Sequence, residues 1–309
     1  MSSILVTGGT GMIGNALQNI LKDKGIYLSS KDCDLTDLNQ TMKTFEKYKP
    51  EYVIHLAAKV GGVAANMNYL GDFYRENILI NTNVLEASRI LNVRKVVSLL
   101  STCVYPDKCE YPLVEKRIHS GPPHHTNYAY AYAKRMLDVQ SRAYRDQYGC
   151  NFITVVPNNL FGKHDNYDLE NSHVIPAMIR KFHEANQSNS DVILWGTGNP
   201  LREFTYSEDL ARIIVLLLEN YNNKEPINVG NTKEISIKQV ANMIAEIMNF
   251  KGKIIWDSTK PDGQKRKPSD CSKLRKQGWI QEMYTDHKTA LLETCKWTIK
   301  NYPNLRGVK

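Results

Sequence analysis

The chain opens on a short apolar run that leads directly into a glycine-rich turn. Gly8, Gly11 and Gly14 are spaced G-x-x-G-x-x-G after Ile4-Leu5-Val6, and an amphipathic stretch follows them. Glycines at such a turn let backbone amides approach a pyrophosphate, whose charge is stabilised by the N-terminus of the next helix. The strand–turn–helix context favours a dinucleotide site over a tight turn without a ligand. This pattern therefore predicts a chain that begins as a dinucleotide-binding α/β fold.

The first half of the chain alternates apolar runs with amphipathic stretches. The apolar runs, which are typical of buried parallel strands, are Ser3–Thr7, Ile26–Leu28, Tyr52–Leu56, Val96–Leu100 and Phe152–Val156. Helical patterns lie between them near residues 12–23, 38–48, 72–91 and 127–148. This series of βαβ units predicts an α/β fold with a doubly wound parallel sheet of the Rossmann type.

The pattern loosens after Pro157. Helical patterns near residues 173–185, 207–220 and 236–249 mix with short apolar runs near residues 191–195, 227–229 and 253–256. We expect a smaller C-terminal α/β domain that binds the substrate and packs over the strand ends. The first domain would span residues 1–160 and the second residues 161–309, and segments can exchange between the two.

The overall charge and the cysteine pattern exclude several classes of protein. The 309 residues carry a net charge of +8, but the Lys and Arg residues are dispersed, which argues against nucleic-acid binding and suits anionic ligands. The six cysteines form no Cys-x-x-Cys motif or Cys/His cluster, so we expect no metal. No apolar run reaches the ~20 residues that span a membrane. Without a signal segment either, we expect no membrane association and a cytoplasmic protein with reduced thiols.

The segment after the second predicted strand bears on the choice of cofactor. It reads Ser29-Ser30-Lys31 and has no acidic residue to bind the ribose 2′-hydroxyl of NAD. Two hydroxyls and a cation suit a 2′-phosphate and favour NADP, with a solvated turn lysine as the alternative for Lys31. Ala57 and Ala58 follow the third strand, where small residues let the chain pass close to a cofactor or simply fill the core.

A Tyr and a Lys four residues apart indicate carbonyl chemistry. Tyr130 and Lys134 share one face of a predicted helix, and Ser101 ends the fourth strand. In this arrangement Tyr130 is the general acid, Lys134 lowers its pKa and binds the nicotinamide ribose, and Ser101 binds the carbonyl. With 17 tyrosines in the chain, a chance pair is the alternative. Cys103 adds a thiol that a simple carbonyl reductase does not need, and taken alone it would be a small buried apolar residue.

Several longer motifs give the chain a specific resemblance that extends over essentially its whole length. It resembles the extended short-chain dehydrogenase/reductases and, within them, the GDP-L-fucose synthase family. The motifs are the glycine turn, His55-Leu56-Ala57-Ala58-Lys59-Val60-Gly61-Gly62, Ser101-Thr102-Cys103, Tyr130-x-x-x-Lys134, His164-Asp165-Asn166, Asn171-Ser172-His173-Val174-Ile175-Pro176-Ala177, Trp195-Gly196, Arg202-Glu203-Phe204 and Arg266-Lys267.

The resemblance implies a two-step reaction in one site. The family converts GDP-4-keto-6-deoxy-D-mannose to GDP-L-fucose by epimerisation at C3 and C5 and then reduction at C4 with NADPH. It implies that Cys103 is the base and His173 the acid of the epimerisation, since a thiol (~8.5) and an imidazole (~6.5) exchange protons near neutral pH. It also implies a homodimer, joined in a four-helix bundle by the helices near 72–91 and 127–148.

The same resemblance implies two sets of binding residues. Those for the cofactor are Gly8, Thr10, Gly11, Met12, Ile13, Gly14, Lys31, Ala57, Ala58, Tyr130, Lys134, Pro157 and His173. Those for the GDP-sugar are Asn159, Lys181, Trp195, Arg202 and Lys267. Family members can carry Arg where this chain has Thr10, which leaves Lys31 as the main contact for the 2′-phosphate. For Arg202, an ion pair with Glu203 or Asp209 is the alternative.

Two other functions compete with this interpretation. One is a related nucleotide-sugar 4-reductase or epimerase that acts on another sugar, against which Cys103 and His173 argue. The other is a non-catalytic NADP-sensing module, against which the intact Tyr130 and Lys134 argue.

Overall fold

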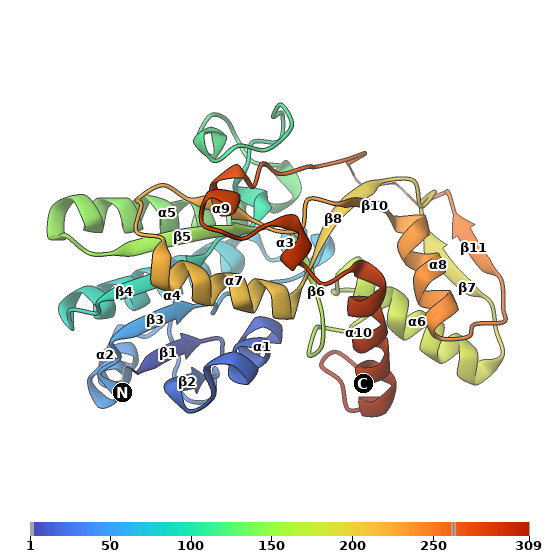
Figure 1. Cartoon of the computed structure of the whole chain (residues 1–309), viewed down its shortest axis with the longest axis horizontal. Helices are drawn as coiled ribbons and strands as arrows, with labels where there is room; N and C mark the ends of the chain where they lie inside the picture. Colours follow the sequence, from blue (N-terminus) through green and yellow to red (C-terminus); the bar gives the residue numbers. More distant parts are fainter. Residues whose placement is uncertain (1–2, 261, 263, 309) are drawn as a thin grey trace.

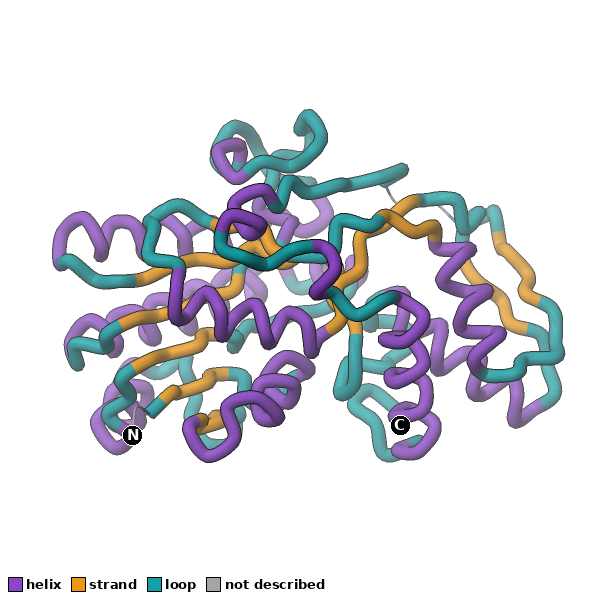
Figure 2. Tube along the Cα trace, in the orientation of Figure 1, coloured by secondary structure: helices purple, strands orange, loops and turns teal. Residues whose placement is uncertain are grey.

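The computed structural model describes residues 3–260, 262 and 264–308, and its largest element is a six-stranded, all-parallel sheet in the order β2-β1-β3-β4-β5-β9 (Figures 1 and 2). Its strands are β1 Ile4–Thr7, β2 Gly25–Leu28, β3 Tyr52–His55, β4 Lys95–Leu99, β5 Phe152–Pro157 and β9 Ile227–Val229. β1, β4, β5 and β9 are buried along their whole length, as expected of strands covered on both faces. The predicted doubly wound α/β fold is confirmed.

Helices cover both faces of this sheet. On one face lie α1 (Met12–Leu21) and α7 (Ser207–Asn220), whose Leu17 and Ile214 join a core with Val6. On the other face lie α2 (Leu38–Tyr48), α4 (Leu70–Ile90) and α5 (Tyr128–Tyr148). α7 and β9 both come from beyond residue 160. The C-terminal half of the chain therefore completes the sheet that the N-terminal half begins.

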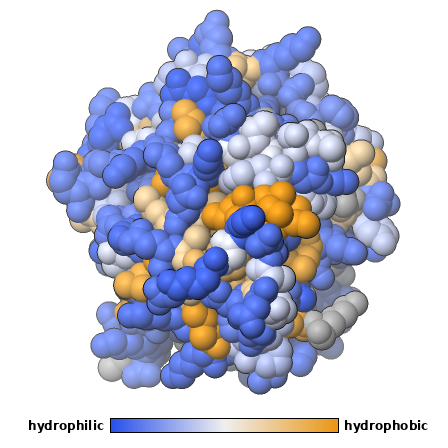
Figure 3. All heavy atoms as spheres, turned by 90° about the vertical axis from the view of Figure 1, so that its right-hand side faces the viewer, coloured by the Kyte–Doolittle hydropathy of each residue, from blue (hydrophilic) through white to orange (hydrophobic). Residues whose placement is uncertain are grey.

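The remaining elements form a smaller region beside the sheet (Figure 1). A three-stranded sheet contains β6 (Asn159–Phe161), β8 (Leu201–Tyr206) and β10 (Glu234–Ser236), and a parallel pair contains β7 (Val192–Trp195) and β11 (Ile254–Asp257). Around them lie α6 (Val174–Ser188), α8 (Ile237–Ile247) and α10 (His287–Asn301), which share a separate apolar core. The outer end of this region is mainly hydrophilic, with a small apolar group near its middle (Figure 3). Two short helices, α3 (Val63–Asn68) and α9 (Ser272–Lys276), complete the set of α-helices in the described residues, and none of these helices is long and apolar enough to cross a membrane.

A buried polar network fastens the chain after β4 to the segment that precedes α9. The Tyr105 hydroxyl donates to Asn228 Oδ1 over 2.6 Å, and the Asn228 amide Nδ2 donates to the Leu113 carbonyl over 2.9 Å. Leu113 N then donates to the Pro268 carbonyl over 2.8 Å. Glu203, which is 2% exposed, accepts the Ser269 N–H over 3.1 Å. These bonds fix the relative position of two loops that are far apart in sequence.

A second buried network joins β1, β3 and α4 through His55. Its Nδ1 lies 2.8 Å from the Thr7 hydroxyl, and its Nε2 lies 3.0 Å from Asn81 Oδ1. Because the amide oxygen can only accept, Nε2 carries the proton and Nδ1 accepts from Thr7. Burial lowers the pKa of His55 to about 3, and the positive charge of Lys134 acts in the same direction. The folded chain therefore holds His55 as a neutral imidazole.

This network predicts a specific loss of stability in acid. The pKa of His55 lies below its unfolded value of ~6.5, so the unfolded chain binds the proton first and stability falls as the pH drops from about 6.5 towards 3. Between about pH 7.5 and pH 5 the wild type should lose about 2 kcal/mol more unfolding free energy than His55→Gln. Urea unfolding of both proteins at the two pH values measures this difference. An equal loss in the two proteins would contradict the account.

Candidate active site

The glycine turn between β1 and α1 is shaped by close backbone contacts. Gly8 has φ +68°, and a Cβ there would lie 2.9 Å from Ala57 N, at the chain that follows β3. A Cβ on Gly14 would lie 2.3 Å from the Gly9 carbonyl oxygen. Gly9, which the three-glycine spacing did not single out, is equally constrained, because its Cβ would lie 2.6 Å from the Cβ of Tyr27. The adjacent glycines at positions 8 and 9 were the sequence signal that could have identified Gly9 as part of the turn.

The N-terminus of α1 is arranged to receive an anion. Its N-cap is Gly11, so no side chain caps the first N–H groups, and the first turn holds no acidic residue. Asn15 Nδ2 donates to the Thr10 and Gly11 carbonyls, each over 2.9 Å, and Gln18 Nε2 donates to the Gly9 carbonyl over 3.1 Å. These bonds occupy the carbonyl oxygens of the turn and leave N–H groups for a ligand. The turn therefore fits the pyrophosphate of a dinucleotide.

The turn after β2 contains an acidic residue, Asp32, whose carboxylate is bound within the protein. The Asp32 carboxylate accepts from Ser29 N over 2.8 Å and from the Ser29 hydroxyl over 2.6 Å. The hydrogen bonds from Ser29 lower the pKa of Asp32. Ser30 and Lys31 are exposed beside it. One of the two hydroxyls expected for a 2′-phosphate is thus engaged by Asp32, while the Lys31 side chain is exposed to solvent.

The predicted carbonyl site lies where α5 crosses the end of β4. Lys134 is buried, and its Nζ donates to the Leu99 carbonyl over 2.8 Å and lies 6.0 Å from the centroid of the Tyr130 ring. Burial lowers the pKa of Lys134 to about 8, and the negative charge of Cys103 acts against this. Burial also raises the pKa of Tyr130, and the negative charge of Cys103 acts in the same direction, so the lowering expected from Lys134 is not found. The side chains at Tyr128 and Tyr132 are exposed instead.

Cys103 lies in the 3-10 turn Thr102–Val104 directly after β4, where Cys103 N donates to the Ser101 hydroxyl oxygen over 3.5 Å. Burial raises the pKa of Cys103, while the Ser101 hydroxyl and the charges of Lys267 and Lys134 act in the opposite direction. Burial lowers the pKa of Lys267, and Cys103 acts against that shift. The structure therefore brings a cation of the C-terminal half beside the thiol of the N-terminal half.

His173 is the N-cap residue of α6. Its neighbour Asp165 was not predicted as a site residue from the sequence. Asp165 is 7% exposed, accepts from Asn166 N over 2.7 Å through Oδ1, and has a buried Oδ2 without a hydrogen-bond partner among the described residues. Burial raises the pKa of Asp165 to about 6, and the charge of His173 acts against that rise. Gly62 N donates to the Asn171 carbonyl over 3.1 Å, which fastens the chain after β3 to this segment. The motif contained Asp165, but nothing in its spacing showed that it is buried near His173.

Two further predicted residues lie together on β7 and α6. The Lys181 ammonium lies 5.8 Å from the Trp195 ring centroid and donates to the Ile193 carbonyl over 2.9 Å. The Lys260 ammonium lies 5.5 Å from the same ring, and the Trp195 side chain is 65% exposed. An exposed indole flanked by two ammonium groups can stack on a base and attract phosphate.

Arg202 and Asn159 are held by backbone carbonyls. Arg202 Nη1 donates to Leu201 O over 2.7 Å and to Gln264 O over 2.6 Å. Burial lowers the pKa of Arg202. Asp209 bonds to Arg212 and Thr285, and Glu203 to Ser269 and Asn158, so the ion pair considered for Arg202 does not form with either. Asn159 Nδ2 donates to the Glu203 carbonyl over 2.9 Å.

Comparison with known proteins places the chain among enzymes. Residues 4–230 match the model of the NAD dependent epimerase/dehydratase family. The chain belongs to this family. It is 47% identical to a GDP-L-fucose synthase of Dictyostelium discoideum, over 98% of this chain and 97% of the relative. It is 35% identical to the GDP-L-fucose synthase of Escherichia coli K12, over 98% of each chain.

A solved structure of a relative has the same fold as this chain. A GDP-L-fucose synthetase from Naegleria fowleri bound to NADP superposes with a TM-score of 0.94 and 45% identity, covering 99% of this chain and 95% of that one. The resemblance predicted from the motifs is confirmed by these relatives, and the fold agrees throughout.

The turn geometry predicts how a single added methyl group affects the cofactor. Gly14→Ala should weaken NADPH binding by at least about tenfold, because α1 must move away from the Gly9 carbonyl and overpacking costs about 1–3 kcal/mol. Fluorescence titration with NADPH measures the change. Gly121→Ala is the matched control, since its Cβ would meet Pro106 at an ordinary 3.4 Å. Wild-type affinity in Gly14→Ala would show that the turn does not hold the cofactor.

Proposed function

We propose that the chain is a bifunctional epimerase-reductase that converts GDP-4-keto-6-deoxy-D-mannose to GDP-L-fucose. It epimerises C3 and C5 and then reduces C4 with NADPH. The observation that carries this proposal is the position of Cys103, which shares one turn with Ser101 and interacts electrostatically with both Tyr130 and Lys134. A proton-exchanging thiol thus lies beside the residues of carbonyl reduction. The relatives named GDP-L-fucose synthase support the same substrate.

Reduction uses Ser101, Tyr130 and Lys134. When bound, NADPH supplies the hydride for C4. Ser101 binds the C4 oxygen, and Tyr130 donates its phenolic proton to that oxygen. Because burial raises the pKa of Tyr130, the phenol stays protonated until the alkoxide forms. Lys134, fixed by the Leu99 carbonyl, keeps a positive charge beside the developing negative charge.

Epimerisation uses the same ketone before it is reduced. The protons on C3 and C5 are acidic because both carbons flank the C4 carbonyl. Cys103 as thiolate removes one proton, the charge passes to the C4 oxygen as an enolate, and His173 returns a proton to the opposite face. Ser101 binds the enolate oxygen just as it binds the ketone. The buried carboxyl group of Asp165 interacts electrostatically with His173.

We assign the binding of the two ligands to the two regions of the chain. Residues 1–160 bind NADPH, with Gly8, Thr10, Gly11, Met12, Ile13 and Gly14 at the pyrophosphate, Lys31 at the 2′-phosphate, and Ala57, Ala58, Pro157 and His173 along the nicotinamide half. Residues 161–309 bind the GDP-sugar, although α7 and β9 of that segment pack on the first sheet. Arg202, Lys267 and Asn159 bind the diphosphate and sugar, while Trp195 and Lys181 bind the nucleotide.

The six cysteines are all free, which supports a cytoplasmic location.

Purified protein given GDP-4-keto-6-deoxy-D-mannose and NADPH tests the assignment. GDP-L-fucose is the product we expect, as identified by chromatography and NMR. An enzyme that reduces or epimerises another nucleotide-sugar would leave this substrate unchanged or stop at a different stereoisomer, and either result would refute the proposal.

Substitution of the proposed base separates the two chemistries. In D2O, Cys103→Ser should lower deuterium incorporation at C3 and C5 by about 10²-fold or more, because a hydroxyl is a far weaker base than a thiolate. NADPH binding should persist. Cys150→Ser, a half-buried cysteine at the far end of α5, is the matched control and should exchange normally. Normal exchange in Cys103→Ser would exclude Cys103 as the base.

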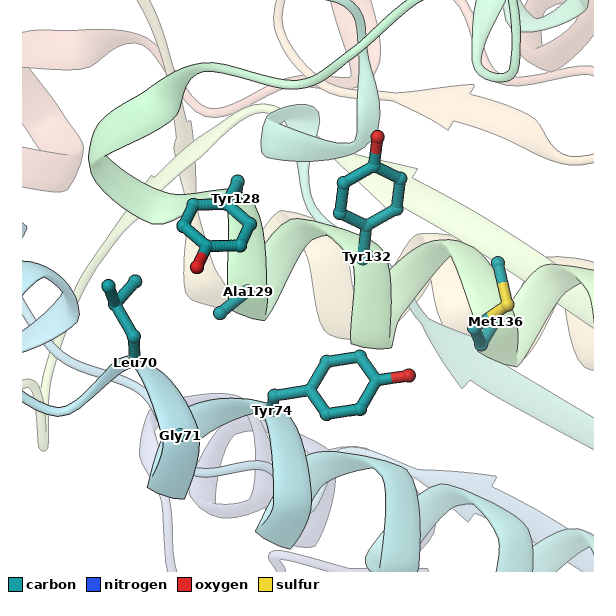
Figure 4. Close-up of a pocket in the computed structure, with 7 residues that line it drawn as sticks. All are labelled: Leu70, Gly71, Tyr74, Tyr128, Ala129, Tyr132 and Met136. Carbon is teal, nitrogen blue, oxygen red and sulfur yellow. The ribbon is translucent and has the colours of Figure 1, made fainter.

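We further propose that two copies pair through α4 and α5 into a four-helix bundle. Between these helices lies a pocket of about 340 Å³ lined by Leu70, Gly71, Tyr74, Tyr128, Ala129, Tyr132 and Met136 (Figure 4). Large side chains are exposed on this face, including Tyr74 at 44%, Tyr128 at 45% and Val139 at 44%. A second copy would cover them and fill the pocket.

Charge placed on this face should separate the copies. Tyr74→Asp combined with Tyr132→Asp should give a monomer by size-exclusion chromatography with light scattering, whereas the wild type should give a dimer, because burying two carboxylates per subunit is unfavourable. Ile280→Asp, an exposed apolar side chain outside α4 and α5, is the control and should remain dimeric. A dimer that survives both Asp substitutions would place the interface elsewhere.

A further inference from the structure

Arg135 is a buried cation that directly contacts the turn carrying Cys103. It follows Lys134 on α5 and is 3% exposed. Its Nε donates to the Val104 carbonyl over 2.7 Å, and Val104 is the residue after Cys103. The turn Thr102–Val104 is therefore fastened to α5 by a charged donor.

This contact leaves part of the guanidinium unsatisfied. Arg135 Nη2 is buried and has no hydrogen-bond partner in the described residues, and its Cζ lies 5.3 Å from the Tyr132 ring centroid. A buried cation with an unpaired nitrogen is costly, and a neutral donor would serve equally well to bind one carbonyl. The negative charges that act on Arg135 are those of Tyr132 and Cys103. Of these two, the thiolate is the one that the proposed reaction forms.

Most of the polar and charged side chains that interact with Cys103 have another role in the proposed reaction, and one of them has none. Lys134 is committed to the Leu99 carbonyl and lies near Tyr130, which also interacts electrostatically with Cys103. Lys267 comes from the segment that we assign to the substrate, and Ser101 binds the carbonyl. Arg135 alone among these cations has no other role in the proposed reaction.

We propose that Arg135 is the positioning residue of Cys103: it fixes the turn through the Val104 carbonyl and stabilises the thiolate. This inference rests on the proposed role of Cys103 as base. The thiol first gives its proton to solvent, and the resulting thiolate, held by the guanidinium, accepts the proton from C3 or C5. The negative charge then passes to the enolate oxygen and the S–H bond is restored.

The rate at which iodoacetamide alkylates Cys103 measures its thiolate content without any turnover. We expect Arg135→Gln, which keeps an N–H donor but removes the charge, to be alkylated at Cys103 about tenfold more slowly at pH 7.5, as one pKa unit would give. Arg135→Lys, which keeps the charge, should recover most of the wild-type rate. Peptide mass spectrometry distinguishes Cys103 from the other five cysteines, and NADPH titration confirms that each variant is folded. Deuterium exchange at C3 and C5 should follow the alkylation rates.

A second arginine of α5 provides the matched control. Arg145 also binds a backbone carbonyl, that of Phe152 over 3.3 Å, together with Asn151 Oδ1 over 2.7 Å. Arg145→Gln should leave the alkylation of Cys103 unchanged. Equal rates in Arg135→Gln and Arg135→Lys would show that charge is irrelevant and would overturn the inference. If the wild type forms no GDP-L-fucose while the alkylation rates still differ, the proposed function fails and the electrostatic role of Arg135 stands.

Discussion

The rest of the site depends on one buried hydrogen bond, from the Lys134 ammonium to the Leu99 carbonyl. It fixes α5 at the point where β4 ends and where Ser101 and Cys103 follow. Burying an ammonium group is unfavourable, as its lowered pKa of about 8 shows. The same charge helps to keep His55 neutral and acts against the rise that burial causes in the pKa of Cys103. One cation thereby biases the protonation of both His55 and Cys103.

A second constraint brings the C-terminal half of the chain to this point. The Asn228 network and the bonds from Leu113 to the segment before α9 hold Lys267 beside Cys103. Glu203 reinforces the contact by accepting the Ser269 N–H. The site is thus built from two regions, and buried polar bonds help to fix their relative position. Such bonds have strict geometry, so they restrict how the two loops lie relative to each other.

The sequence predicted those parts of the fold that depend on local pattern. Buried parallel strands are continuous apolar runs, and Tyr130 and Lys134 share a face because of helical geometry. The strands β6, β8 and β10 and the helix α10 were not predicted. In β8 the reason is that Glu203 and Thr205 are buried polar residues that interrupt the apolar pattern. The pairing of β9 with β5, the burial of Asp165 and the contact of Arg135 with Val104 are tertiary and leave no trace in spacing. The roles of Ser101, Tyr130 and Lys134 were inferred from their spacing, those of Cys103 and His173 came from the resemblance, and the structure adds the electrostatic contacts among them.

The central claim is that one polarised ketone serves two separable reactions, with Cys103 acting on its neighbouring carbons and Tyr130 on its oxygen. The most direct measurement is NMR of GDP-4-keto-6-deoxy-D-mannose incubated in D2O with NADPH and Tyr130→Phe. The account predicts deuterium at C3 and C5, an intact C4 ketone and no NADPH oxidation, because the proton donor is lost while the thiol remains. Absence of deuterium at both carbons, or reduction at the wild-type rate, would contradict it.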